Sequence, residues 1–360
     1  MVGQTLDDFY AQAANGTLPA ISYIIGPAEL SEHPPYAPRD GAWLQKQVID
    51  AVTKGKEYSK TALIISYDET GGWGDHVTPY HSPSGTAGEW LHDPYNEVGY
   101  TYSGPGFRLP FYIISPWTRN GNVFTEHADH NSQIMFIEEW LAAKGKNVVT
   151  SQMVPWRRQH MSSLVNAFDF ANPDFSLPSL PDAPAPHKNV GGDYDGATYC
   201  ESQYSVTRPP VPYTNQIATN NVSSLSEQSF KEMRGALTEG RYIVFELGGY
   251  ALTNAGKSAT EFTTTKATPT HSDISQRWVV HSLVDGGNIF TISSAKDGGY
   301  LGSHTDSSSG AETYTVSFVP SQGYALQKES GKYVNVDGNG NVQIGNVPSY
   351  FKAFSVTYSS

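Results

Sequence analysis

Cysteine, positive charge and long apolar runs are all scarce in this sequence. Cys200 is the only cysteine among 360 residues, so no disulfide can form within the chain. The formal net charge is −12, which argues against nucleic acid as a partner, because nucleic-acid binding needs a basic face. No apolar run approaches the roughly 20 residues that a membrane-spanning helix requires. The opening residues also lack the pattern of a signal peptide.

Glycine, proline and tyrosine are plentiful, with 34, 23 and 22 residues. Charged residues make up only 16% of the chain. This composition indicates loops and β structure rather than long charged helices. The length suits one large domain or two ordinary ones.

Helical and extended patterns alternate in the first part of the chain. Thr5 followed by two aspartates predicts a helix over residues 5–14. Residues 19–26 have the pattern of a buried strand, and an apolar stripe over residues 41–54 predicts a helix that crosses back to the strand beginning at Ala62. This alternation is typical of an α/β fold with a mostly parallel sheet.

The stretch over residues 61–79 carries the clearest chemical signal. Its apolar strand is followed by Asp68 and Glu69 and then by a pair of glycines. Adjacent carboxylates at the end of a buried strand predict a site for a hard metal ion, since glycine frees the backbone to turn both oxygens to one side. A solvated acidic turn is the alternative that these residues leave open.

Three histidines are candidates for phosphate binding or proton transfer. Pro34 forces His33 into an extended backbone, which holds its imidazole in a fixed direction. His127 and His130 precede a predicted helix over residues 133–141, and a positive helix end beside an imidazole favours phosphate. A surface-loop role for His33, and capping or packing for the other two, are the alternatives.

The second half of the chain changes character twice. Residues 156–224 are rich in proline without periodicity and predict a linker on the surface. Residues 225–360 are β-rich, and a strand followed by a turn and a Gly-Tyr or Gly-Lys-Tyr strand recurs three times. This recurrence resembles a β-trefoil, whose function would be to bind glycans or lipid surfaces, or only to pack.

Five stretches of the N-terminal part resemble a family of phosphoesterases. The family includes phosphatidylcholine-hydrolysing (non-specific) phospholipase C and some acid phosphatases, and the resemblance is to its fungal type. It covers roughly residues 4–145, in the family's order and at about its spacing. The stretches are LDDFYAQAANGTLPAISYI, SEHPP, IISYDETGGWGDHVTP, GPGFRLPFYIISPWTRNG and HADHNSQIMFIEEW.

The resemblance implies an alkaline-phosphatase-like α/β sandwich with one divalent metal ion. It places Asp68 and Glu69 at the acidic pair that binds the metal in the family. It places His33, in the SEHPP stretch, at a histidine near the substrate phosphate. A phosphorylated Thr or Ser nucleophile is also a family feature.

The resemblance assigns two further Asp-His pairs. Asp75 and His76 match the pair that follows the two glycines, in direct or indirect contact with the metal. Asp129 and His130 match the pair before the next helix. Thr70 stands where many members have His or Asn. The candidate catalytic residues are therefore His33, His76 and His130.

One departure from the family is large. The family's first half carries a Glu-Asn pair and the nucleophile, and this sequence contains no Glu-Asn pair. We therefore expect residues 1–155 to be the C-terminal half of a catalytic domain, incomplete at its N-terminus. This chain alone is expected to bind metal weakly and to turn over little.

These features together predict a hydrolase of phosphoric ester bonds. It would resemble phospholipase C, which releases diacylglycerol and a phosphorylated head group. An acid phosphatase, or a non-catalytic remnant whose β module binds glycan or membrane, are the alternatives. The substrate would be a phospholipid or another phosphate ester, and the full-length protein is expected to be secreted or bound to the cell wall.

Overall fold

The computed structural model describes residues 5–75, 77–207, 228–256, 261–284, 286–302 and 308–358. Two compact units are each assembled from separate stretches of chain. The first unit comprises Met1–Pro79, Gly106–Arg119 and Pro173–Asn220, and the second comprises Tyr80–Pro105, Asn120–Asn172 and Asn221–Ser360. The predicted division into 1–155, 156–224 and 225–360 stays a prediction. No helix among the described residues is long and apolar enough to cross a membrane.

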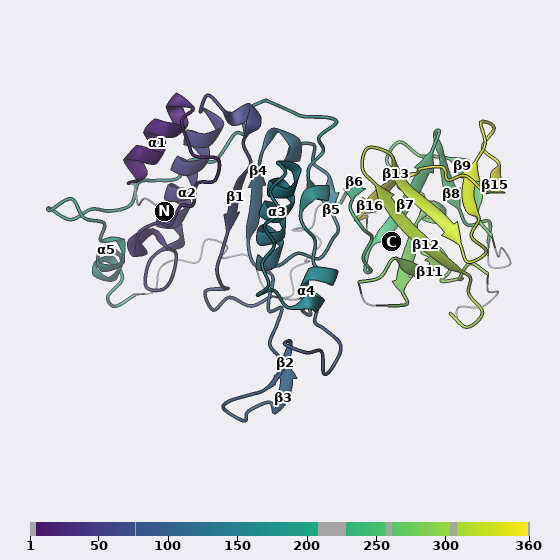
Figure 1. The fold of residues 1–360 in the computed structure, drawn as a ribbon, viewed down its shortest axis with the longest axis horizontal. Helices are drawn as coiled ribbons and strands as arrows, with labels where there is room; N and C mark the ends of the chain where they lie inside the picture. The colour runs from purple at the N-terminus through teal and green to yellow at the C-terminus, as the bar shows by residue number, and fades with distance from the viewer. Residues whose placement is uncertain are drawn as a thin grey trace. The chain divides into compact units, whose positions relative to one another are not determined.

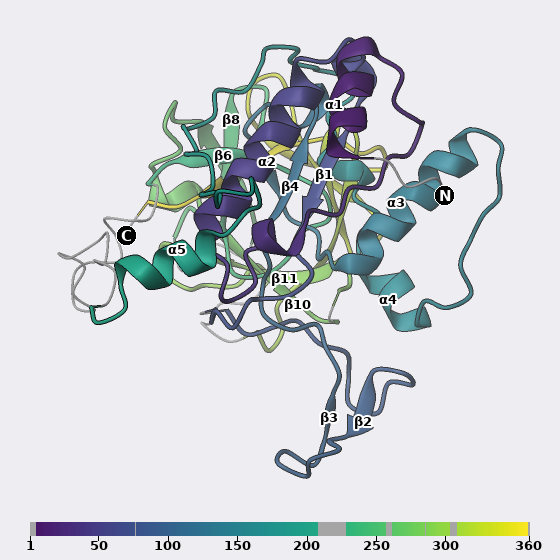
Figure 2. The same ribbon diagram turned by 90° about the vertical axis from the view of Figure 1, so that its left-hand side faces the viewer.

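The first unit packs helices against a short pair of strands (Figures 1 and 2). Its core joins Phe9, Leu44, Val48 and Val52 from two helices, with Leu63 of the first strand packed against them. Its elements are α1 (Leu6–Asn15), η1 (Ala28–Leu30), α2 (Pro38–Thr53), η2 (Tyr58–Lys60), β1 (Leu63–Ser66), β4 (Phe111–Ile114), η3 (Pro116–Thr118) and α5 (Gly196–Gln203).

Both predicted helices of this unit are confirmed, and local signals set their ends. Thr5 caps α1 through a capping box with Asp8, and Gly16 ends the helix in a left-handed conformation with φ of 74°. Pro38 occupies the first turn of α2, where its missing N–H costs nothing.

The prediction of parallel strands in this unit is wrong. β1 pairs with β4 in antiparallel register, Leu63 opposite Ile114. Residues 19–26 form no strand, and Tyr23 and Ile25 are 82% and 80% exposed. A short apolar run is buried only when another element packs against it. The sequence of the run does not specify that such an element is present.

The second unit contains helices, a hairpin and a large β module. α3 confirms the predicted helix, and it begins one residue after its cap, Asp129. Within the segment predicted to be a linker, Trp156, Met161 and Leu164 are buried. The elements before the module are β2 (Trp90–His92), β3 (Tyr100–Tyr102), β5 (Val123–Phe124), α3 (His130–Ala143), α4 (Pro155–His160) and η4 (Val165–Ala167).

The β module confirms the predicted β-rich region. Two of the three predicted strand-turn-strand repeats are observed as the β7–β8 and β13–β14 hairpins. In the third, residues 299–301 form no strand, and Tyr300 makes only a single bridge to Ser293 of β11. Its elements are β6 (Phe230–Arg234), β7 (Tyr242–Leu247), β8 (Tyr250–Thr253), β9 (Thr263–Lys266), η6 (Ile274–Gln276), β10 (Trp278–Ser282), β11 (Ile289–Ser294), β12 (Thr313–Val319), β13 (Gly323–Lys328), β14 (Tyr333–Val336), β15 (Val342–Gly345) and β16 (Lys352–Val356).

Six strands of the module close into a ring. Antiparallel pairings run from β16 through β7, β10, β11 and β12 to β13. Tyr324 and Phe351 then exchange two N–H···O bonds of 2.8 Å, which join β13 to the start of β16. Large side chains fill the interior, and Phe245, Trp278 and Phe290 are each at most 1% exposed. Ring closure removes the free sheet edges that an open sheet would present.

We expect Gly323→Ala to open this ring. Gly323 has φ of 117°, and an added Cβ would lie 2.3 Å from the carbonyl oxygen of Phe351. The clash and the strained backbone should lower the free energy of unfolding by about 3 kcal/mol. Gly331→Ala is the matched control, because Gly331 also has positive φ but faces open space. Denaturant unfolding that gave equal losses for the two variants would contradict this account.

His271 should make the module less stable in acid. The residue is 4% exposed, its ring lies against the rings of Phe230 and Phe354, and burial lowers its pKa. The unfolded chain therefore binds this proton more readily, so stability should fall as pH drops through the ordinary histidine value of about 6.5. Glu246 Oε2 lies 3.8 Å from His271 Nε2, and burial raises the pKa of this carboxyl. Glu246 is present in both the native protein and the His271→Gln variant, so the comparison of the two isolates His271. Melting temperatures between pH 5 and 8 should show a smaller acid loss in His271→Gln, and an equal loss would refute the assignment.

Candidate active site

A hydrogen-bonded triad fixes the backbone at the end of β1. The Tyr67 hydroxyl donates to Glu32 Oε1 at 2.9 Å. Gln45 Nε2 on α2 donates to the same carboxylate oxygen at 3.0 Å and to the Tyr67 hydroxyl oxygen at 2.6 Å. Burial and the Glu32 carboxylate raise the pKa of Tyr67 to about 12. The phenol therefore keeps its proton at neutral pH and remains a donor to Glu32.

The sequence makes room for this triad in two ways. Glu32 adopts a left-handed backbone with φ of 65°, which turns its side chain toward α2. Gly41 on α2 then lies so close that a Cβ there would be 2.1 Å from Glu32 Cγ. The triad joins residues adjacent to His33 and to Asp68, so it holds these two segments of the predicted site together.

Asp68 and Glu69 follow β1 after one intervening residue, Tyr67, and both are exposed. Asp68 Oδ1 accepts the backbone N–H of Glu69 at 3.0 Å. Gly71 and Gly72, with φ of 62° and 82°, turn the chain immediately afterwards. Accessible carboxylate oxygens of this kind suit a hard divalent cation. The described part of the chain contains no group of three or more metal-ligating side chains.

His33 has a defined tautomer when it is neutral. Its Nδ1 lies 2.7 Å from the carbonyl oxygen of Pro34, and the residue is exposed. A carbonyl oxygen can only accept, so Nδ1 carries the hydrogen and Nε2 is the basic nitrogen. His33 can therefore exchange a proton, or bind an anion, through Nε2.

Asp75 is paired with an arginine that the sequence analysis did not single out. Its carboxylate accepts two bonds from the Arg108 side chain, at 2.7 and 2.9 Å, and one from the Arg108 backbone N–H at 3.1 Å. The side chain of Arg108 is 61% exposed, while that of Asp75 is 9% exposed. A bidentate pair of this type orients the guanidinium. His76, the neighbouring predicted residue, lies outside the described residues.

His130 belongs to the second unit, whereas His33, Asp68 and Glu69 belong to the first. It is the first residue of α3 and is exposed. Asp129 caps the helix by accepting the backbone N–H of Ser132 at 3.3 Å. Capping, one of the two roles that the sequence leaves open for this region, is thus performed by Asp129.

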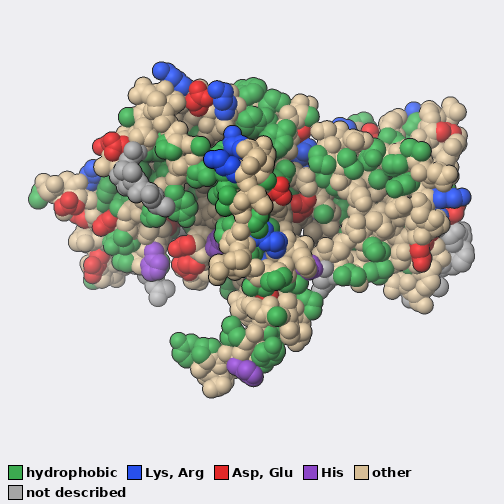
Figure 3. All heavy atoms as spheres, viewed as in Figure 1, with side chains coloured by type: hydrophobic (Ala, Val, Ile, Leu, Met, Phe, Trp, Pro, Cys, Tyr) green, Lys and Arg blue, Asp and Glu red, His purple; other side chains and the backbone are tan. Residues whose placement is uncertain are grey.

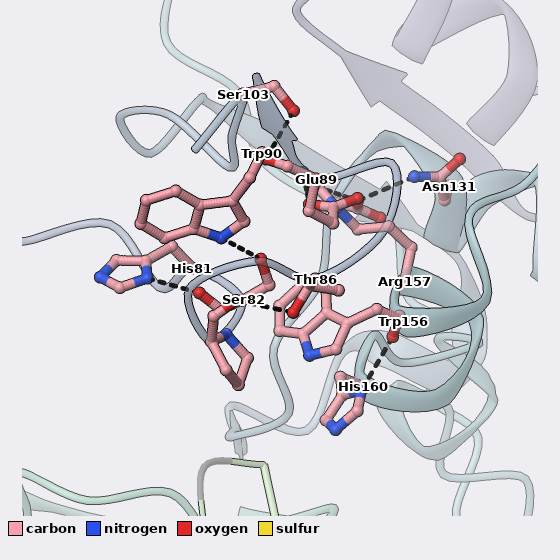
Figure 4. A network of polar contacts seen from close by, with 12 residues as sticks. His81, Ser82, Thr86, Glu89, Trp90, Ser103, Asn131, Trp156, Arg157 and His160 are labelled. Atoms are coloured by element: carbon pink, nitrogen blue, oxygen red, sulfur yellow. Dashed lines mark hydrogen bonds and ion pairs between the residues drawn. The ribbon is translucent and has the colours of Figure 1, made fainter. Parts of the chain in front are cut away.

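A buried ion network supports the start of α3 (Figure 4). Arg157 on α4 donates to Asp129 at 2.7 Å and to both carboxylate oxygens of Glu89 at 2.9 Å. The three side chains are 12%, 10% and 3% exposed. The network fastens residues 80–105 to both helices. Its members are far apart in sequence, and only the unusual Arg157-Arg158 pair within an apolar segment signals it.

Comparison with known proteins confirms the resemblance of the N-terminal region. Residues 1–142 match the model of the Phosphoesterase family. The non-hemolytic phospholipase C of Burkholderia pseudomallei is 40% identical over half of this chain and 27% of its own length. That of Pseudomonas aeruginosa is 32% identical over 72% of this chain and 36% of its own. Phospholipase C A of Mycobacterium tuberculosis is 32% identical over 57% and 40%. The chain thus spans well under half the length of these relatives.

Arg157→Met should destabilise the second unit strongly. It leaves the buried carboxylate of Glu89 without its partner, which costs about 3–5 kcal/mol for an ion pair of this burial. Arg158→Met is the control, because Arg158 is 33% exposed and pairs with Glu138 nearer the surface. Urea unfolding of both variants measures the difference. A loss from Arg157→Met no larger than that of the control would show that the network is not a major support.

Proposed function

We propose, from the match of residues 1–142 to the phosphoesterase family, that this chain carries a hydrolase acting on phosphoric esters. Its proposed reaction is that of a phospholipase C, which converts a phospholipid into diacylglycerol and a phosphorylated head group. The relatives reported above are named as phospholipases C, which supports this reaction class. The proposed fold of the matched region is the alkaline-phosphatase-like sandwich.

One structural observation carries the metal part of the proposal. Asp68 and Glu69 stand exposed at the end of β1, inside the matched region, with a glycine turn behind them. We propose that they hold one divalent metal ion, whose chemistry would be to offset the negative charge of the phosphate.

The surrounding side chains have supporting roles in this proposal. His33 Nε2 would donate to a phosphate oxygen when protonated, or accept a proton when neutral. The Tyr67–Glu32 bond would keep the His33 and Asp68 segments in place during turnover. His76 and His130 remain proposed catalytic residues on the strength of the resemblance.

The β module is proposed to be β-trefoil-like. The closed ring of six strands, the two observed hairpins and the Ser293–Tyr300 bridge support this assignment. A glycan or membrane ligand for the module, and secretion of the full-length protein, stay predictions.

The test is hydrolysis of nitrophenyl-phosphorylcholine and nitrophenyl phosphate by the full chain. We expect a low rate, faster with the choline diester, that falls about a hundredfold with chelator or with Asp68→Asn, because loss of a metal removes its charge stabilisation. Asp182→Asn is the control, an exposed acid outside the predicted site.

Calorimetric titration with divalent ions separates the two parts of the proposal. Weaker binding by Asp68→Asn than by Asp182→Asn supports the metal site. A rate that neither chelator nor Asp68→Asn changes would overturn the metal assignment. Preference for nitrophenyl phosphate would point to the phosphomonoesterase instead, and no hydrolysis of either compound would overturn the activity proposed for this chain.

A further inference from the structure

The hairpin formed by β2 and β3 carries an exposed apolar surface. Figures 1 and 2 show it projecting from α3 and α4 of its own unit, and Figure 3 shows hydrophobic side chains and a histidine on its visible face. Leu91, Tyr95, Val98 and Tyr100 are 44%, 82%, 71% and 48% exposed. Such a concentration of exposed apolar groups on one projecting element is typical of an interaction site.

The tip of this hairpin is ordered by hydrogen bonds that form within it. The Asp93 carboxylate accepts the backbone N–H groups of Tyr95, Glu97 and Val98 at 3.0, 2.7 and 3.1 Å. The backbone N–H of Asp93 donates to the carbonyl oxygen of Gly99 at 2.7 Å. The negative charge of Asp93 is therefore used within the turn, while Tyr95 and Val98 stay exposed on a fixed frame.

The base of the hairpin is braced against the rest of the unit. The centroids of the stacked His81 and Tyr102 rings lie 4.4 Å apart. Trp90 Nε1 donates to Ser82 Oγ at 3.1 Å (Figure 4). Glu89, the residue before β2, is held by Arg157. Because the hairpin is already ordered, it can bind a surface without changing conformation, so little conformational entropy is lost on binding.

The lack of basic side chains in this segment indicates which kind of surface it binds. Residues 80–107 contain no lysine or arginine. An anionic membrane would select basic side chains here, and they are absent from this stretch of sequence. The segment contains four tyrosines and one tryptophan. Both residue types prefer the boundary between the apolar and polar layers of a bilayer.

We propose that the β2–β3 hairpin seats in the surface of a zwitterionic phospholipid bilayer, with Tyr95 and Val98 entering the interface. This inference rests on the proposed function, in which the substrate is itself a bilayer phospholipid. The hairpin raises the local concentration of substrate by holding the enzyme at the membrane. This proposed membrane contact is separate from the glycan or membrane ligand predicted for the β module.

Binding of the full chain to phosphatidylcholine vesicles tests the proposal. The double variant Tyr95→Ser with Val98→Ser should lower the vesicle partition coefficient about tenfold, because two apolar side chains no longer leave water. Val148→Ser with Val149→Ser is the matched control, since these valines are 55% and 60% exposed in the same unit. Adding phosphatidylglycerol should not strengthen binding.

Activity measurements separate this proposal from the proposed function. The hairpin variant should hydrolyse soluble nitrophenyl-phosphorylcholine at the native rate. Its rate of hydrolysis of vesicle phospholipid should fall about tenfold, in line with its weaker partitioning. A chain that binds vesicles through the hairpin but hydrolyses neither substrate would refute the proposed function alone. Native protein that does not bind the vesicles, or equal binding losses in the hairpin and control variants, would overturn the hairpin proposal.

Discussion

The ion pairs of Arg157 hold in place two regions of the second unit, the start of α3 with His130 and the base of the β2–β3 hairpin. The Arg157 guanidinium is nearly excluded from water and satisfies two carboxylates, one before β2 and one capping α3. Buried charges are tolerated only when they are paired, so the loop, the cap and α4 are fixed as a set. The exposed position of His130 and the bracing of the hairpin both follow from this pairing, since each lies next to one of the carboxylates.

Sequence reasoning succeeded where the signal is local. The caps of α1, the apolar stripe of α2 and the helix after Asp129 each follow from residues within a few positions of one another. The position of Asp68 and Glu69 after β1 was predicted for the same reason. The resemblance to a family then supplied roles that no local pattern contains.

The errors and omissions all concern partners distant in the chain. The pairing of β1 with β4 depends on a strand almost 50 residues later, and the apolar pattern of β1 fits parallel and antiparallel neighbours about equally. Glu32 meets Tyr67 across 35 residues, and Glu89 meets Arg157 across 68. In each case the local sequence indicates that a residue needs a partner. It does not identify that partner, because the rest of the fold determines which distant residue lies beside it.

The closed ring has a consequence for how the β module is made. β16 pairs with both β6 and β7, the first strands of the module, and Phe351, the residue just before β16, completes the contact with β13. During vectorial synthesis on the ribosome, the ring therefore cannot close until residue 356 has emerged. Until then the earlier hairpins expose unpaired edges and apolar faces, which favour association with other chains. Chaperone demand for this module should peak late in translation, however early its first strands appear.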